Sequence, residues 1–216
     1  MEGYLALIIT AVSIGVIHTL AGPDHYLPFV VLSKARKWNN IRTINIVILS
    51  GLGHVISSII IGFIGIAAGV SLTRIEFLEG FRGNIAAWLL FSFGVAYTAW
   101  AVFRLLRKKV HGHKHFKPGD EKKQLTFWIL FTIFVFGPCE PLIPILMYPA
   151  ARHNYAAAGL ISLIFAIATI STMLISVFVL LKGFSLVKIS ALEKYQHLLA
   201  GSAIILCGAG ILFLGL

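Results

Sequence analysis

Hydrophobic residues dominate this chain in long runs, which are separated by short polar and basic segments. Six runs can be distinguished, over residues 4–33, 43–70, 84–106, 125–151, 155–181 and 198–216. A helix that spans the ~30 Å hydrocarbon core of a bilayer needs roughly 20 apolar residues, and each run reaches about that length. The pattern therefore predicts an all-α integral membrane protein with six transmembrane helices.

The composition agrees with this fold class. Of the 216 residues, 58% are hydrophobic and only 12% are charged, and the mean hydropathy is +0.92. A soluble domain with this composition would expose too much apolar surface. The first run lacks the positive segment and cleavage site of a signal peptide, so we expect it to be a span. The two cysteines, Cys139 and Cys207, include no Cys-x-x-Cys pair, which excludes a disulfide framework or a zinc ribbon.

The basic residues predict the orientation in the membrane. Fifteen of the 18 lysines and arginines lie in the first, third and fifth loops, whereas the other side receives Arg74, Arg82 and Arg152. Because cytoplasmic loops carry an excess of Lys and Arg, we expect a multi-pass protein of the inner (cytoplasmic) membrane with both termini on the outer side. The net charge of +10 is explained by topology, and no nucleic-acid partner is expected.

Two of the runs share a Gly-Pro interruption at equivalent positions. Gly22-Pro23 and Gly137-Pro138 are 115 residues apart, and the same offset pairs Gly53 with Ala168. Each interruption opens a group of three runs, so the second group must enter the membrane from the opposite side. This predicts a 3+3 inverted repeat with broken helices 1 and 4. The first repeat covers residues 1–106, a cytoplasmic loop covers 107–124 and the second repeat covers 125–216. Alternatively, Gly-Pro merely kinks two ordinary helices.

Two acidic residues lie deep in apolar runs. Of the eight acidic residues, six lie in loops or near the N-terminus, whereas Asp24 and Glu140 lie one and two residues, respectively, after a Gly-Pro interruption. A carboxylate in the middle of a membrane helix costs about 2.5–3.5 kcal/mol on insertion scales, so it usually faces a cavity or a partner. The equivalent placement predicts one shared site between the halves. The alternative is that each carboxylate caps its own half-helix.

Histidines and a cysteine extend this site. His18, His25 and His54 lie in or beside the first two runs, and Cys139 lies in the second interruption. Imidazole with carboxylate suits borderline divalent transition metals, and a thiolate favours softer ions. The predicted metal ligands are His18, Asp24, His25, His54, Cys139 and Glu140. A single histidine would more often be a hydrogen-bond donor between helices. His111, His113 and His115 in the basic loop either bind metal transiently or are incidental.

Some of these strings resemble known families. His18, Leu20, Gly22, Asp24, His25 and Leu27 resemble the first-span signature of HupE/UreJ-type nickel permeases, and Leu52-Gly53-His54 with Ser57 and Ser58 resembles the NiCoT, NicO and UreH-like nickel–cobalt transporters. The wider group has four residues between the first His and the Asp, whereas this chain has five. The Gly137-Pro138-Cys139-Glu140-Pro141 interruption resembles the Pro-Cys break of DsbD/CcdA-type thiol–electron carriers.

The residues and the resemblance together predict a secondary transporter, or permease, for divalent transition metals, and the resemblance implies nickel or cobalt. We expect no enzymatic activity and no permanently bound cofactor. The expected partners are membrane lipids and the metal ion, which is the substrate; homo-oligomerisation, the direction of transport and proton coupling are left open. One alternative is a membrane thiol–disulfide electron carrier, which needs Cys139 and Cys207 to meet. Another is an anion or organic-solute exporter of related architecture.

Overall fold

The described part of the protein is α-helical, with one short 3₁₀ helix. A computed structural model of the chain describes residues 2–108, 120–186 and 190–215. In chain order its elements are α1 (Glu2–Ala21), η1 (Pro23–His25), α2 (Leu27–Arg36), α3 (Asn40–Ala67), α4 (Leu72–Lys108), α5 (Asp120–Phe136), α6 (Leu142–Ala151), α7 (Tyr155–Leu186) and α8 (Ser190–Leu214). The predicted all-α class is confirmed. His111, His113 and His115 lie outside the described residues.

Several helices are long and apolar enough to cross a membrane, as expected for a multi-pass membrane protein. Within the described residues, α3, α4, α7 and α8 each meet this criterion. Leu5–Ala21 of α1 and the segment Pro23–Arg36 meet at an angle of 87°, and they make a fifth span if this bent pair is counted as one. α5 and α6 are shorter apolar helices. The predicted six transmembrane helices in a 3+3 repeat are not confirmed, because α5 and α6 are each shorter than a span. Pro138 and Pro141 between them lack the N–H donors that would continue α5 into α6.

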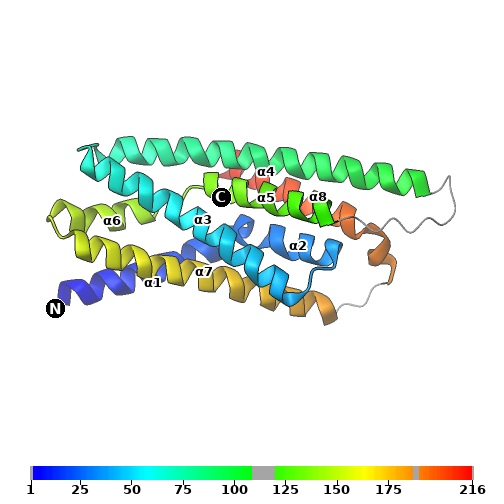
Figure 1. The fold of residues 1–216 in the computed structure, drawn as a ribbon, viewed down its shortest axis with the longest axis horizontal. Helices are drawn as coiled ribbons and strands as arrows, with labels where there is room; N and C mark the ends of the chain where they lie inside the picture. The colour runs from blue at the N-terminus through cyan, green and yellow to red at the C-terminus, as the bar shows by residue number, and fades with distance from the viewer. Residues whose placement is uncertain (1, 109–119, 187–189, 216) are drawn as a thin grey trace.

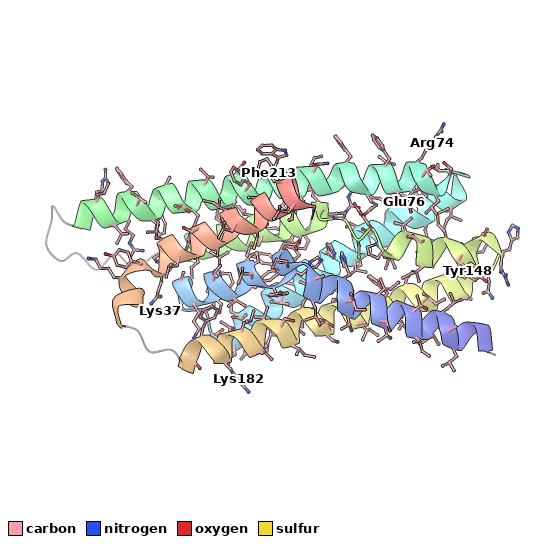
Figure 2. The ribbon with its side chains drawn as sticks, turned by 180° about the vertical axis from the view of Figure 1, so that it is seen from behind. Lys37, Arg74, Glu76, Tyr148, Lys182 and Phe213 are labelled. Atoms are coloured by element: carbon pink, nitrogen blue, oxygen red, sulfur yellow. The ribbon has the colours of Figure 1, made fainter. Side chains whose placement is uncertain are left out.

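The two interruptions lie near the middle of an elongated bundle. Figure 1 shows α1 and α6 in one half of its long axis and α2, α5 and most of α8 in the other half, whereas α3, α4 and α7 run through both. Lys37 and Lys182 lie at one end, and Arg74 and Tyr148 lie at the other (Figure 2). The N-terminus lies at the end that carries Tyr148, and the chain's C-terminal end lies near the middle of the long axis (Figure 1).

α4 begins earlier than the hydrophobic pattern indicates. The third hydrophobic run starts at residue 84, whereas α4 starts at Leu72. The additional turns include Glu79 and Arg82, which form an ion pair three residues apart. Side chains at this spacing lie on the same helix face, so the two opposite charges can neutralise each other within the helix. The expected position of Arg82 in an outer loop is therefore wrong, since only 12% of its side chain is exposed.

Glycines bring α4 and α8 into close contact. A Cβ atom added to Gly94 would lie 2.7 Å from the backbone nitrogen of Ile205, and one added to Gly208 would lie 2.7 Å from that of Phe91. The residue numbers rise along α4 as they fall along α8, so the two helices are antiparallel. Because each neighbour is a backbone atom, a larger side chain at either glycine requires the helices to separate.

Buried side chains form two clusters that differ in size. The larger cluster draws on α2, α5 and α8 and on parts of α3, α4 and α7, and it includes Phe29, Leu130 and Ile204. The smaller cluster draws on α1, α6 and the adjoining parts of α3 and α7, and its buried members are Ala11, Val55, Cys139, Leu142, Ile145, Ile161 and Phe165. α2, α5 and most of α8, which contribute only to the larger cluster, and α1 and α6, which contribute only to the smaller one, lie in opposite halves of the bundle (Figure 1). The interruptions at Gly22 and Gly137 therefore lie between two packed regions.

The α4–α8 contact makes a prediction about stability. Replacing Gly208 with Ala should destabilise the protein by about 1–3 kcal/mol, because the added methyl group overpacks a backbone contact. Gly159→Ala in α7 is the matched control, since no atom lies within 4 Å of the Cβ that it would add. Thermal unfolding of the purified proteins in one detergent would compare them. Equal stability of the two variants would show that α4 and α8 are not in close contact.

Candidate functional site

The first interruption folds its side chains back over the end of α1. His25 Nδ1 lies 3.2 Å from the carbonyl oxygen of Gly22 and 3.3 Å from Asp24 Oδ1. A Cβ atom on Gly22 would lie only 2.6 Å from that same nitrogen, so a larger residue at this position would displace the His25 ring. Both partners of Nδ1 are acceptors, so Nδ1 carries the hydrogen and the lone pair of the neutral ring lies on Nε2.

Three imidazoles meet beside this interruption. The rings of His18 and His25 are 4.8 Å apart and those of His25 and His54 are 5.1 Å apart, and both pairs are nearly perpendicular. His25 and His54 are buried, with exposed fractions of 4% and 2%. The Nε2 atom of each of the three rings has no hydrogen-bond partner among the described residues. Buried polar atoms are nearly always bonded, so three such nitrogens in one place indicate room for a ligand.

Cys139 joins two of these histidines. One ligand atom each from His18, His54 and Cys139 lies within 4.8 Å of the others. Around a tetrahedral ion with bonds of about 2.0–2.3 Å, ligand atoms lie roughly 3.5 Å apart, so small side-chain movements would close this set on a metal. The Cys139 side chain is fully buried in the smaller cluster. The structure thus brings together a two-histidine, one-cysteine donor set.

Asp24 lies next to this set and faces a cavity. Its carboxylate contacts His25, and 26% of its side chain is exposed. The adjoining cavity has a volume of about 320 Å³. Its lining includes His18, Asp24, His25, His54, Gly137 and Pro138, together with small and apolar residues of α4, α5 and α8. A carboxylate that accepts the Nδ1 hydrogen of a histidine fixes the ring and strengthens its other nitrogen as a metal ligand.

Glu140 does not belong to this site. Its side chain is exposed and lies beside α4, with one carboxylate oxygen 3.7 Å from the position of a Cβ on Gly80. It lines neither the cavity nor the donor set. In this structure Asp24 and Glu140 therefore share neither the cavity nor the donor set, contrary to the expectation of one shared site. The offset of 115 residues matches Asp24 with Cys139 rather than with Glu140, and a shift of one residue turns a side chain by about 100° around a helix.

A buried ion pair holds the second interruption, and the sequence analysis missed it. Glu79 is fully buried and pairs with Arg82. Its carboxylate accepts a hydrogen bond from the backbone nitrogen of Cys139 at 3.1 Å, and Arg82 Nη2 donates to the carbonyl oxygen of Val135 at 2.7 Å. The spacing Glu-x-x-Arg directly before an apolar run is the signal that could have revealed the pair, since such charges can enter a membrane helix together.

The second cysteine lies elsewhere. Cys207 belongs to the larger buried cluster and is 5% exposed. It lines a smaller cavity of about 140 Å³ with Pro23, Asp24 and three apolar side chains. Both cysteines are free thiols. Cys139 and Cys207 are thus held in different packing environments.

Comparison with known proteins gives one family. The family model for the transmembrane region of cytochrome c biogenesis proteins matches residues 27–213. The chain belongs to this family. The match supports the resemblance of the Cys139 interruption to DsbD/CcdA-type proteins and gives no support to the nickel and cobalt permeases. The matched part includes His54 and Cys139 but starts after His18, Asp24 and His25. Comparisons with curated proteins and with solved structures give no match.

The placement of the cysteines in this cytochrome c biogenesis family member makes a prediction about their oxidation state. Denatured without reductant, each chain should take up two alkyl groups from a thiol reagent, because both thiols are buried in separate clusters. Mass spectrometry of the alkylated protein would count them. A chain that takes up none until it is reduced would contain a disulfide between Cys139 and Cys207, and the separate placement of the two would then be wrong.

Proposed function

We propose that the protein is a secondary transporter for divalent transition-metal ions. The observation that carries this proposal is the set of ligand atoms of His18, His54 and Cys139 within 4.8 Å of one another, inside an apolar bundle. An uncompensated group of polar atoms in a membrane core is costly, so it marks a substrate or ion pathway more often than packing. The metal is the substrate, and no catalytic step is proposed.

The adjoining residues suit the same task. His25 lies against both other histidines, and Asp24 supplies a negative charge at the cavity. Two imidazoles and a thiolate favour ions of borderline softness, which include cobalt, nickel and zinc. Nickel or cobalt is the identity we propose, although the family match gives no support for either.

Reciprocal contacts support an inverted repeat of residues 1–106 and 125–216. Gly94 contacts Ile205, and Phe91 contacts Gly208. In the repeat, a residue of α4 corresponds to the residue of α8 whose number is 114 higher. Gly94 then corresponds to Gly208 and Phe91 to Ile205, so the two contacts are equivalent. Such exchange is expected of two units related by a two-fold axis. In the same way, α1 packs against α7 and α3 packs against α5. With α5 and α6 counted as one broken span, each half has three.

The position of the site supports alternating access. The donor set lies beside both interruptions, and its Cys139 belongs to the smaller buried cluster. Transporters built from inverted repeats commonly bind their substrate at broken helices near the membrane midplane. Rocking of one half against the other would open one packed cluster while the other stays closed.

A membrane thiol–disulfide electron carrier is the second candidate, and the family match favours it. Exchange requires a thiolate to attack a disulfide sulfur directly, so two sulfur atoms must meet. Cys139 belongs to the smaller cluster and lies beside two histidines. Cys207 belongs to the larger cluster and lines a cavity with Asp24. This separation favours the metal transporter. An anion exporter is less compatible with Asp24 at the cavity, because a carboxylate repels anions.

The proposed orientation in the inner membrane can be tested at the two ends of the bundle. In a chain without cysteines, Tyr148→Cys should react with an impermeant maleimide added to intact cells, because Tyr148 is exposed at the end that carries few basic residues (Figure 2). Lys37→Cys, at the basic end, should react only after permeabilisation. The opposite pattern would invert the topology and place the N-terminus inside.

Metal binding can be tested by thermal stabilisation. Wild-type protein should gain about 2.7 kcal/mol of stability when Co²⁺ or Ni²⁺ is present at 100 times its Kd. His54→Gln and Cys139→Ser should lose most of this gain, because each removes a ligand. Glu140→Gln and Cys207→Ala are the controls and should keep it, since neither residue belongs to the donor set. Wild-type protein without any metal-dependent gain, or a Cys139→Ser variant with the full gain, would refute the proposal.

A further inference from the structure

The Glu79–Arg82 pair contacts the backbone of one proposed ligand directly. The Glu79 carboxylate accepts a hydrogen bond from Cys139 N at 3.1 Å and another from Ser58 Oγ at 2.8 Å. Ser58 Oγ is the second acceptor near Cys139 N, at 3.2 Å. Because Ser58 is itself bound by Glu79, both acceptors of the Cys139 N–H depend on this one carboxylate.

The same pair reaches the other side of the donor set through a hydroxyl group. Arg82 Nη2 donates to Ser57 Oγ at 2.7 Å, and Ser57 Oγ donates to the carbonyl oxygen of His54 at 2.8 Å. Arg82 Nη2 also donates to the carbonyl oxygen of Val135 in the last turn of α5. The guanidinium group therefore connects α3, which carries His54, to the end of α5, which leads to Cys139.

Two proposed ligands, His54 in α3 and Cys139 in the break between α5 and α6, are thus linked by hydrogen bonds to one ion pair from α4. Within the interruption, Pro138 and Pro141 donate no backbone hydrogen bonds. The carbonyl oxygen of Cys139 accepts from Leu142 N at 3.0 Å, whereas its N–H group bonds only to Glu79 and Ser58 among the described residues. Residues that orient metal ligands can change metal affinity by about 10- to 100-fold without touching the metal. Glu79 is fully buried, so its contacts are shielded from water.

We propose that Glu79 and Arg82 are the positioning residues of the metal site, and that they determine whether Cys139 takes part in binding. The proposal rests on the proposed function. With the pair intact, the site binds through imidazole and thiolate. Without it, Cys139 is displaced and the histidines bind alone, so the preference for thiolate-binding ions is lost.

Cobalt provides the readout, because a Co²⁺–thiolate bond gives a charge-transfer absorption that imidazole ligands do not give. The full-length protein in detergent would be titrated with CoCl₂. In Arg82→Gln and Glu79→Gln, the Co²⁺ concentration that gives half of this band should rise by about 10- to 100-fold. Co²⁺ binding measured by equilibrium dialysis should persist through the histidines. Arg82→Lys keeps the charge and should recover part of the band.

Two residues of the same helix provide matched controls. Arg74 is exposed and Glu76 is half-buried, and Figure 2 shows both near the end of α4, away from its centre. Arg74→Gln and Glu76→Gln change the same charges and should leave the band unchanged.

The outcomes separate the two proposals. A wild-type protein that gives no Co²⁺–thiolate band refutes the metal site and this inference with it. A wild-type band that keeps its affinity in Arg82→Gln and Glu79→Gln refutes only the positioning role. If the Gln variants do not yield folded protein, Arg82→Lys decides: a weakened band in the folded variant supports the inference, and a wild-type band overturns it.

Discussion

The buried Glu79–Arg82 ion pair is the interaction on which the second interruption depends. A break in a helix leaves carbonyl and N–H groups without partners, and inside a membrane each such group costs several kcal/mol. Arg82 donates to the carbonyl group of Val135 before the break, and Glu79 accepts from the N–H group of Cys139 within it. The pair therefore provides hydrogen-bond partners for both kinds of backbone group. Either charge alone would be strongly destabilising in this position, whereas the pair is neutral.

The first interruption meets the same requirement with its own residues. His25 folds back on the carbonyl group of Gly22, and the hydroxyl group of Tyr26 donates to the carbonyl oxygen of Leu20 at 3.3 Å. No residue of another helix is needed for these bonds. The two breaks are therefore chemically different although their sequences are similar. At corresponding positions, the first break has the Asp24 carboxylate at the cavity and the second has the Cys139 thiol.

The sequence was sufficient to predict the helical class, the two interruptions and the nearness of His18, His54 and Cys139. These follow from strong signals, namely hydrophobic run length, Gly-Pro pairs and polar residues that are rare in apolar segments. The side-chain directions at a break could not be predicted, because no helical periodicity continues through it. Glu140 was misplaced for this reason. Glu79 and Arg82 were missed because two charged residues next to an apolar run look like part of a loop. Only their ion pair, which the structure shows, makes burial of both in a helix possible.

The donor set divides unequally between the two halves of the chain. Its two histidines, His18 and His54, precede residue 106, whereas Cys139 follows residue 125. If the halves rock against each other, an ion would keep its nitrogen ligands and exchange its sulfur ligand during each cycle. A very soft ion would leave the sulfur slowly, and a hard ion would bind the nitrogens weakly. The rate at which the bond between the ion and the Cys139 sulfur breaks would then determine which metal is transported. The most tightly bound ion would act as an inhibitor rather than as a transported substrate.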